Sequence, residues 1–406
     1  MLQKPRGTRD FLPDEMEQRR DVEQTMREAA RRWGYREVCT PTFEQQELYT
    51  IKSGDGIISE MYTFNDKGGR PLALRPEGTA AILRMYVNEA KVMSKPIRWC
   101  YLADCYRYER PQKGRYRQFW QFGAELIGAD TPAADAEIIL LADEILRPSQ
   151  VRFDLHVGHL APMKHLLRDL APGKQQEIMA LLDKRNFEGV AASLATIKNE
   201  ELAGELEALV TCRTVEDAFA ICGDLPEKIR IEEMIAILDG QELAYQLNLG
   251  IVRGLDYYTG MVFEGFADNL GAENQIIGGG SYRLAHLFGG EDVSSVGFGI
   301  GFDRVMVARG EIAPPAQPVV AIVSTPEAQD WAFSVGRAFR SAGIRTELNL
   351  LERGLGAQMK HAAKRAGWVL VIGGNEAAAQ SVTIKNMATG EQQTCTVQEA
   401  VAEVTV

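Results

Sequence analysis

The segment from residue 97 to residue 128 constrains the fold more than any other stretch, because it reads as two strands joined by a short turn. Side chains repeat on the same face of a strand every second residue. In RQFWQFGAELIG, which follows the turn, Gln121, Gly123 and Glu125 therefore share one face while the opposite face is apolar. The pattern predicts an antiparallel hairpin whose polar face leaves room for a small polar ligand.

The turn between these strands is strongly cationic. Between residues 98 and 117 the acidic side chains are Asp104 and Glu109, and the basic ones are Arg98, Arg107, Arg110, Lys113, Arg115 and Arg117. A guanidinium group binds phosphate oxygens through two parallel hydrogen bonds. The turn therefore favours a polyphosphate ligand beside the polar sheet face, with a solvated charged turn as the alternative.

Glycine clusters mark the second half of this region, in RGLDYYTG, QIIGGGSYRL and SSVGFGIGFDR. We expect the glycine triplet at a strand end, and the last segment to pass through a glycine-rich turn into a helix that carries Arg304. The chain contains neither a GxGxxG fingerprint with a suitable acidic residue nor a GxxxxGK[ST] loop. Phosphates must then be held by side chains, for which Arg107, Arg115, Arg253 and Arg304 are the candidates.

The rest of the chain divides into recognisable regions. Apolar residues at helical spacing predict a helix over residues 13–33, and Pro41 follows at an expected sheet edge or subunit boundary. Residues from about 163 to 247 read as an inserted helical module. After the linker EIAPPAQP, strands alternating with helices predict a compact α/β domain.

Composition excludes several classes of protein. The 406 residues have an ordinary soluble composition and enough length for two or three domains. The chain has no apolar run of membrane-spanning length, so we expect a cytoplasmic protein without a membrane span. Six scattered cysteines without a CxxC pair indicate buried thiols, and the histidines match no metal-ligand spacing. The formal charge of −11 requires any RNA partner to meet a local basic patch.

Together these motifs resemble the histidyl-tRNA synthetases, a family of class II aminoacyl-tRNA synthetases. The likeness is carried, in the order found in that family, by PRGTRDFLP, LRPEGTA, YRYERPQKGRYRQFWQFGAE, RGLDYYTG, the GGG cluster and GFGIGFDR. It implies an α+β catalytic domain, with a six-stranded antiparallel sheet flanked by helices. It also implies a helical insertion that touches the tRNA acceptor stem, a C-terminal α/β anticodon-binding domain, and a homodimer built partly through the Pro41 region. The expected boundaries are 1–160 and 236–312 for the catalytic core, 161–235 for the insertion and 317–406 for the C-terminal domain.

The resemblance also implies roles for individual residues. Arg107 and Arg253 would act in catalysis at the α-phosphate of ATP, with Mg²⁺ assisting and no metal site built from the protein alone. The nucleotide-binding positions are Arg107, Glu109, Arg115 and Arg304. The histidine-binding positions are Glu77, Thr79, Gln121, Glu125, Tyr257 and Tyr258. The implied partners are L-histidine, ATP and tRNA(His).

A paralogue of these synthetases serves as the regulatory subunit of ATP phosphoribosyltransferase and is the main alternative. Such chains tend to lose the catalytic arginines and the RGLDYY signature and usually lack the anticodon domain, whereas this sequence has all of them. A nucleotide-binding sensor is a third alternative. One departure from the family concerns the glycine cluster, which many relatives continue as GGGRYD and this chain continues as Ser281, Tyr282 and Arg283. No role is carried over to Ser281 or Arg283.

Overall fold

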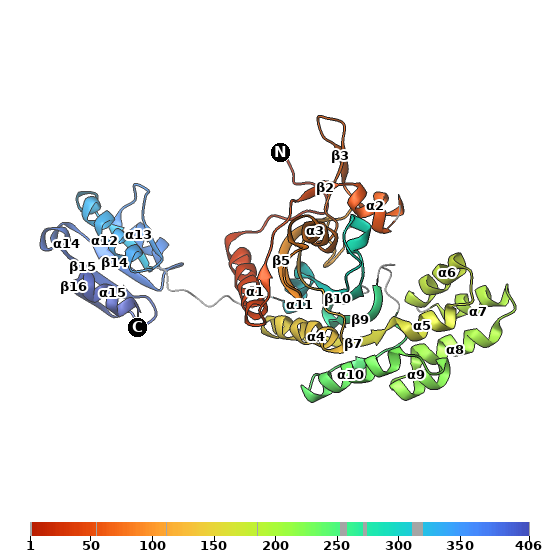
Figure 1. Cartoon of the computed structure of the whole chain (residues 1–406). Helices are drawn as coiled ribbons and strands as arrows, with labels where there is room; N and C mark the ends of the chain where they lie inside the picture. Colours follow the sequence, from red (N-terminus) through yellow and green to blue (C-terminus); the bar gives the residue numbers. More distant parts are fainter. Residues whose placement is uncertain are drawn as a thin grey trace. The chain divides into compact units, whose positions relative to one another are not determined.

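The structure is a computed structural model that describes residues 2–53, 55–110, 112–184, 186–251, 258–270, 274–310 and 320–405. It comprises two compact units, Met1–Ile312 and Ala313–Val406 (Figure 1). Each unit has its own hydrophobic core.

The first unit is built on an eight-stranded sheet in the order β1-β5-β6-β11-β10-β9-β7-β8. The strands, in that order, are Arg36–Glu37, Ile97–Tyr106, Gln118–Ile127, Ser295–Gly301, Gln275–Tyr282, Tyr258–Phe266, Asp154–His159 and Gln246–Leu247. The six central strands all pair antiparallel, and the two short outer strands pair parallel to their neighbours. The predicted antiparallel sheet is confirmed, with an additional short strand at each edge.

Helices cover both faces of this sheet. On one face α1 (Pro13–Arg32), α4 (Pro132–Leu146) and α11 (Phe302–Arg309) pack on apolar side chains of the central strands. On the other face α3 (Thr79–Met85) contributes to a second cluster with β5, β9 and β10. The predicted first helix is confirmed, and it ends where Gly34 adopts a left-handed φ of 80°.

A small sheet in the order β2-β4-β3 lies beyond the main one. Its strands are Phe43–Gln45, Pro71–Leu74 and Thr63–Asn65, and α2 (Glu47–Ser53) follows β2. Buried Arg75, directly after β4, donates to the backbone oxygens of Thr40, Pro41 and Asp104. The segment that carries Glu77 and Thr79 follows directly and is thereby tied to the main sheet.

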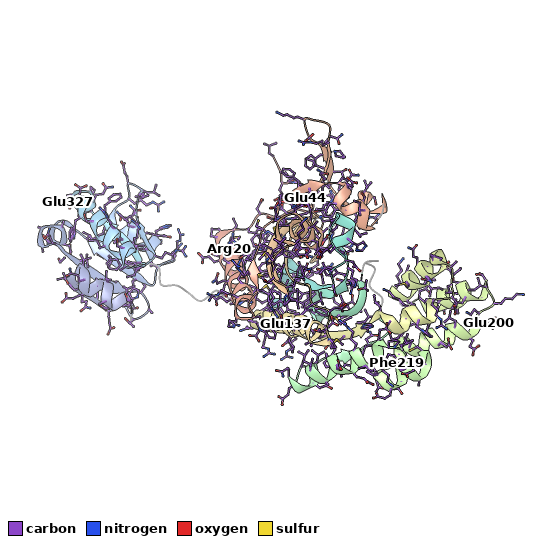
Figure 2. The ribbon with its side chains drawn as sticks, viewed as in Figure 1. Arg20, Glu44, Glu137, Glu200, Phe219 and Glu327 are labelled. Atoms are coloured by element: carbon purple, nitrogen blue, oxygen red, sulfur yellow. The ribbon has the colours of Figure 1, made fainter. Side chains whose placement is uncertain are left out.

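An inserted helical module connects β7 to β8 (Figure 1). Its helices α5 to α10 span Leu160–Leu167, Pro172–Asp183, Phe187–Ala195, Glu200–Thr211, Val215–Cys222 and Glu227–Gly240. They share a separate core that includes Phe219 (Figure 2). Helix α10 also packs on α4 of the sheet layer.

The second unit has a five-stranded sheet in the order β13-β12-β14-β15-β16. Its strands are Thr346–Leu348, Val320–Ser324, Trp368–Ile372, Ser381–Asn386 and Gln392–Thr396. Its helices α12 to α15 are Gln329–Ser341, Leu355–Ala362, Gly374–Ala379 and Val397–Thr405. The α/β pattern expected after the linker is confirmed, including the final hairpin with Gly390 at a φ of 80°.

The cysteine prediction holds only in part. Four of the thiols are buried, but Cys39, which follows β1, is exposed, and Cys395, which lies on the edge strand β16 of the second unit, is half-buried. Among the residues described, no helix combines the length and the apolar character that crossing a membrane requires.

Candidate functional site

The polar face of the main sheet has a floor of glycines. Strand β11 pairs with β6 so that Gly297 lies opposite Glu125 and Gly301 lies opposite Gln121. A Cβ atom at Gly297 would overlap the Glu125 carboxylate, and one at Gly299 would lie 2.6 Å from the amide nitrogen of Gln121. The glycines therefore make space for the polar side chains of the neighbouring strand.

This arrangement corrects three predictions. The triplet 278–280 lies inside β10 rather than at a strand end. Gly297 and Gly299 lie inside β11, and Gly301 is its last residue, so that no glycine-rich turn separates β11 from α11. The space above Gly123 is also taken, because a Cβ atom there would overlap the ring of Tyr101. Room for a ligand lies over β10 and β11 instead.

One cavity gathers most of the predicted histidine-binding residues. It is lined by Glu77, Thr79, Arg107, Gln121, Tyr258, Gly278, Tyr282, Gly297, Phe298 and Gly299. Glu125 is fully buried beside it and accepts hydrogen bonds from the Thr79 hydroxyl at 2.9 Å and from the Tyr282 hydroxyl. A buried carboxylate held by two hydroxyl groups is an oriented acceptor at the edge of this cavity.

Other hydrogen bonds fix the remaining side chains of this cavity. The Glu77 carboxylate accepts from the backbone nitrogens of Thr79 at 2.6 Å and Ala80 at 3.1 Å, at the start of α3. The Gln121 amide oxygen accepts from the Tyr101 hydroxyl at 3.4 Å. Burial, followed by the Glu125 carboxylate, raises the pKa of Tyr101 well above its ordinary value, so this phenol keeps its proton.

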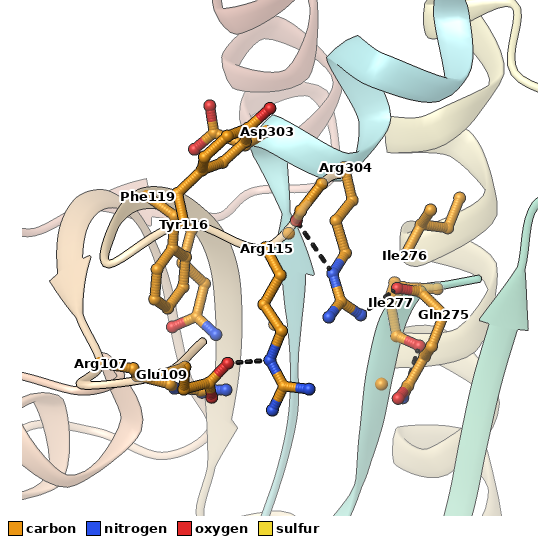
Figure 3. Close-up of a pocket in the computed structure, with 15 residues that line it drawn as sticks. Arg107, Glu109, Arg115, Tyr116, Phe119, Gln275, Ile276, Ile277, Asp303 and Arg304 are labelled. Atoms are coloured by element: carbon orange, nitrogen blue, oxygen red, sulfur yellow. Dashed lines mark hydrogen bonds and ion pairs between the residues drawn. The ribbon is translucent and has the colours of Figure 1, made fainter. Parts of the chain in front are cut away.

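A second cavity, of about 140 Å³, gathers the predicted nucleotide-binding residues (Figure 3). Its charged lining residues are Arg107, Glu109, Arg115, Asp303 and Arg304. Arg115 pairs with Glu109, and Arg304 donates to the backbone oxygens of Gln275 at 2.7 Å and Gly114 at 3.4 Å. The guanidinium groups of Arg115 and Arg304 end in the same cavity (Figure 3), where they can meet phosphate oxygens.

The two cavities are neighbours on one face. Arg107, Gln121, Gly278 and Gly299 line both. Arg107 is oriented by a 3.0 Å hydrogen bond from its Nε to the backbone oxygen of Pro76. A cation that lines both cavities can contact ligands in both.

Two predicted site residues, Arg253 and Tyr257, lie outside the described residues. The neighbouring Tyr258 begins β9 and lines the first cavity. All the other predicted positions line one of the two cavities, apart from Glu125, which contacts Thr79.

Sequence reasoning missed two residues of the site. Tyr282 lies two residues after Gly280 on β10 and so shares its face, which the strand period could have indicated. Asp303 lines the second cavity and accepts from the backbone nitrogen of Trp120 at 2.6 Å. That contact joins positions 183 residues apart, and no local pattern signals it.

The altered glycine cluster has a structural explanation. The Ser281 hydroxyl donates to Asp135 of α4 at 2.6 Å, on the sheet face opposite Tyr282. Arg283 pairs with Asp130 and Asp292. Neither side chain lines the two cavities.

Known proteins are similar to this chain over both of its units. The family described as histidyl-tRNA synthetase matches residues 7–305, and the one described as anticodon binding domain matches residues 317–406. The histidine-tRNA ligase of Methanoculleus marisnigri is 65% identical over 404 residues, which cover 100% of this chain and 98% of that protein.

Solved structures have the same fold. The apo histidyl-tRNA synthetase of S. aureus superposes with a TM-score of 0.75 at 27% identity and covers 100% of both chains. A protein of Bacillus halodurans described as an ATP phosphoribosyltransferase regulatory subunit/histidyl-tRNA synthetase gives a TM-score of 0.77 at 25% identity, covering 92% of this chain and 97% of that one. The match to the synthetase fold thus extends over both compact units.

Proposed function

The chain belongs to the histidyl-tRNA synthetase family, and from this membership we propose that it is a histidine-tRNA ligase. It activates L-histidine with ATP to histidyl-adenylate and then transfers the histidyl group to the 3′-terminal adenosine of tRNA(His). The observation that carries the proposal is the pair of adjoining cavities, which share Arg107 and Gln121. The first is the polar cavity, which we assign to histidine. The second is the cationic cavity, which we assign to ATP and call the nucleotide cavity.

Adenylation needs cations at the phosphates. A carboxylate oxygen of histidine attacks the α-phosphorus in line, and pyrophosphate leaves with the electron pair of the broken bond. We assign Arg107, at the junction of the cavities, to the α-phosphate and the histidine carboxylate, together with Arg253 from the family motif. Arg115 and Arg304 bind the outer phosphates. Such oriented charges can contribute several kcal/mol to the transition state once the bound substrates displace water from the cavity.

Mg²⁺ would be held together with the phosphates of ATP. Among the described residues, no three His, Cys, Asp or Glu side chains gather in a way that could hold a metal ion. Mg²⁺ is commonly held by one or two carboxylates together with substrate phosphates, and Glu109 is the lining carboxylate suited to that role. The ion supplies further positive charge at the phosphates when bound.

Histidine is selected by the polar cavity. An imidazole ring presents a donor and an acceptor on opposite edges, and a site that pairs both strongly rejects apolar isosteres. Glu125 accepts from the ring on one side and Tyr258 meets it on the other, while Tyr257 completes the wall. Glu77, Thr79 and Gln121 hold the α-amino group.

Beside the catalytic core, two further regions would bind the tRNA. We propose the catalytic core at 1–160 and 236–312, the helical insertion at 161–235 against the acceptor stem, and the C-terminal domain at 317–406 on the anticodon. The anticodon-domain match over residues 317–406 supports the last assignment.

We also propose that the chain works in the cytoplasm as a homodimer. An exposed aromatic pair next to Pro41 supports the dimer, since Phe43 and Phe64 stack edge to face at 6.3 Å while 52% and 44% exposed. Exposed apolar side chains that lie together, rather than scattered singly, are the kind of surface that a partner subunit can cover.

The regulatory-subunit alternative is not favoured. Curated relatives that are 65%, 63% and 61% identical over the length of the chain are named histidine-tRNA ligase. Three arginines that such regulatory chains tend to lose line the nucleotide cavity here, namely Arg107, Arg115 and Arg304.

A pyrophosphate exchange assay tests the proposed function. The purified chain should incorporate labelled pyrophosphate into ATP when L-histidine is the amino acid supplied. Exchange supported by another amino acid alone would refute the specificity. Stimulation of an ATP phosphoribosyltransferase without any exchange would establish the regulatory alternative.

A further inference from the structure

We propose that Arg9, in the N-terminal segment, positions the nucleotide cavity for ATP. Arg9 does not line the cavity itself. It contacts two residues that do, Tyr116 from the cationic turn and Asp303 from the start of α11.

The first contact holds the cationic turn. The Arg9 guanidinium lies 3.8 Å from the centroid of the Tyr116 ring, a stacking distance at which a cation is attracted to the aromatic face. The same segment pairs with the turn through its backbone, because the nitrogen of Arg117 donates to the oxygen of Gly7 at 2.9 Å. Tyr116 follows Arg115, so the position of its ring is coupled to the phosphate-binding guanidinium.

The second contact holds the start of α11. Asp303 forms ion pairs with Arg9 and with Arg19, the latter at 2.8 Å, and it accepts from the Trp120 nitrogen at 2.6 Å. Arg304 is the next residue. Arg9 thereby links the two elements that carry Arg115 and Arg304, from outside the cavity.

Arg9 is separable from the folding core, whereas Arg19 is not. The Arg19 side chain is 1% exposed and is enclosed by the rings of Phe11, Trp120 and Phe302, while the Arg9 side chain is 24% exposed. Without Arg9, the buried Asp303 carboxylate still has Arg19 and the Trp120 nitrogen as partners. Removing Arg9 should therefore loosen the cavity without leaving a buried charge unpaired.

This inference rests on the proposed function, because it assigns the second cavity to ATP. The test compares Arg9→Met and Arg9→Lys with wild type, and Arg6→Met serves as the control because Arg6 is an exposed arginine of the same segment. In pyrophosphate exchange, Arg9→Met should raise the KM for ATP about tenfold, since small misplacements of binding groups cost this much or more. The KM for histidine and the melting temperature should stay near wild type. The KM of Arg9→Lys for ATP should lie between those of wild type and Arg9→Met, because lysine keeps the positive charge but lacks the planar guanidinium group.

A double variant shows whether Arg9 acts through Tyr116. Tyr116→Leu alone should raise the KM for ATP, and adding Arg9→Met should produce a smaller increase than the product of the two single effects. The equilibrium dissociation constant for ATP, measured without histidine, should follow the same order.

Three results would overturn the inference. The first is an Arg9→Met protein with unchanged ATP binding. The second is an Arg9→Met protein in which the KM values for ATP and for histidine rise equally and the melting temperature falls, which would show that Arg9 has only a structural role. Full multiplication of the two single effects would remove the route through Tyr116. Each of these leaves the proposed function standing if the wild type exchanges pyrophosphate. A wild type that neither binds ATP nor exchanges would overturn both.

Discussion

At the scale of single residues, the site depends on a buried acceptor, Glu125. Replacing it with glutamine keeps the shape but removes the charge that Thr79 and Tyr282 orient. We expect the kcat/KM for histidine to fall about a hundredfold, in line with the cost of mispairing a buried charged group. The dissociation constant for ATP should change little, and equal losses for both substrates would indicate that Glu125 is only structural.

The glycine floor makes a second prediction at this scale. In Gly297→Ala the new methyl group would overlap the Glu125 carboxylate and lie 2.6 Å from the Ala124 backbone oxygen. We expect the free energy of unfolding to fall by about 1 to 3 kcal/mol, the usual cost of overpacking, together with loss of histidine-dependent exchange.

Gly204→Ala is the matched control, because a Cβ atom there would meet nothing within 4 Å and the residue lies in α8. Alanine is favoured over glycine inside a helix by about 0.5 to 1 kcal/mol. Urea denaturation should therefore show a small gain at Gly204. A Gly297→Ala protein as stable and active as this control would contradict the account of the floor.

At the scale of elements, we expect the start of helix α5 to lose stability at low pH. The Nδ1 atom of His159 accepts the backbone hydrogen of Ala161 at 3.1 Å, which requires an unprotonated nitrogen. Burial, with smaller contributions from Arg230 and Lys164, lowers the pKa of His159 to about 4. The unfolded state therefore binds a proton from about pH 6.5 downward while the folded state does not.

Stability from this group is thus complete above pH 6.5 and is lost as the pH falls toward 4, by about 3 kcal/mol in all. His159→Asn keeps a good helix-capping residue that does not titrate. Urea unfolding between pH 7 and 4.5 should show a shallower loss of stability for this variant than for wild type. Identical slopes would show that His159 protonates equally in both states.

The elements also show how far the sequence could be interpreted. Alternation and helical spacing predicted α1, β5, β6 and the strands of the C-terminal unit, because these patterns depend on near neighbours. The glycines of β11 looked like a turn because local preference for turns competes with strand pairing, and here the side chains of β6 decide. Contacts such as Arg9 with Asp303 join residues 294 positions apart, so no spacing rule could find them.

At the scale of the whole molecule, the two compact units have separate cores and separate expected tasks. Deleting residues 317–406 should leave histidine-dependent pyrophosphate exchange within about threefold of wild type. Aminoacylation of tRNA(His) should fall about a hundredfold in kcat/KM, because one of two linked binding sites is lost. Unaltered charging would remove the anticodon role, and lost exchange would show that the first unit depends on the second.

The bare floor of β11 has a consequence for inherited variation. Every substitution at Gly297 adds a Cβ atom, because glycine has no side chain. We therefore expect substitutions here to disturb the site by steric overlap with Glu125 rather than by loss of a reactive group. A ranking of natural variants by the loss of charged side chains would not identify this position. We therefore expect glycine at position 297 to be required as strictly as the arginines of the nucleotide cavity.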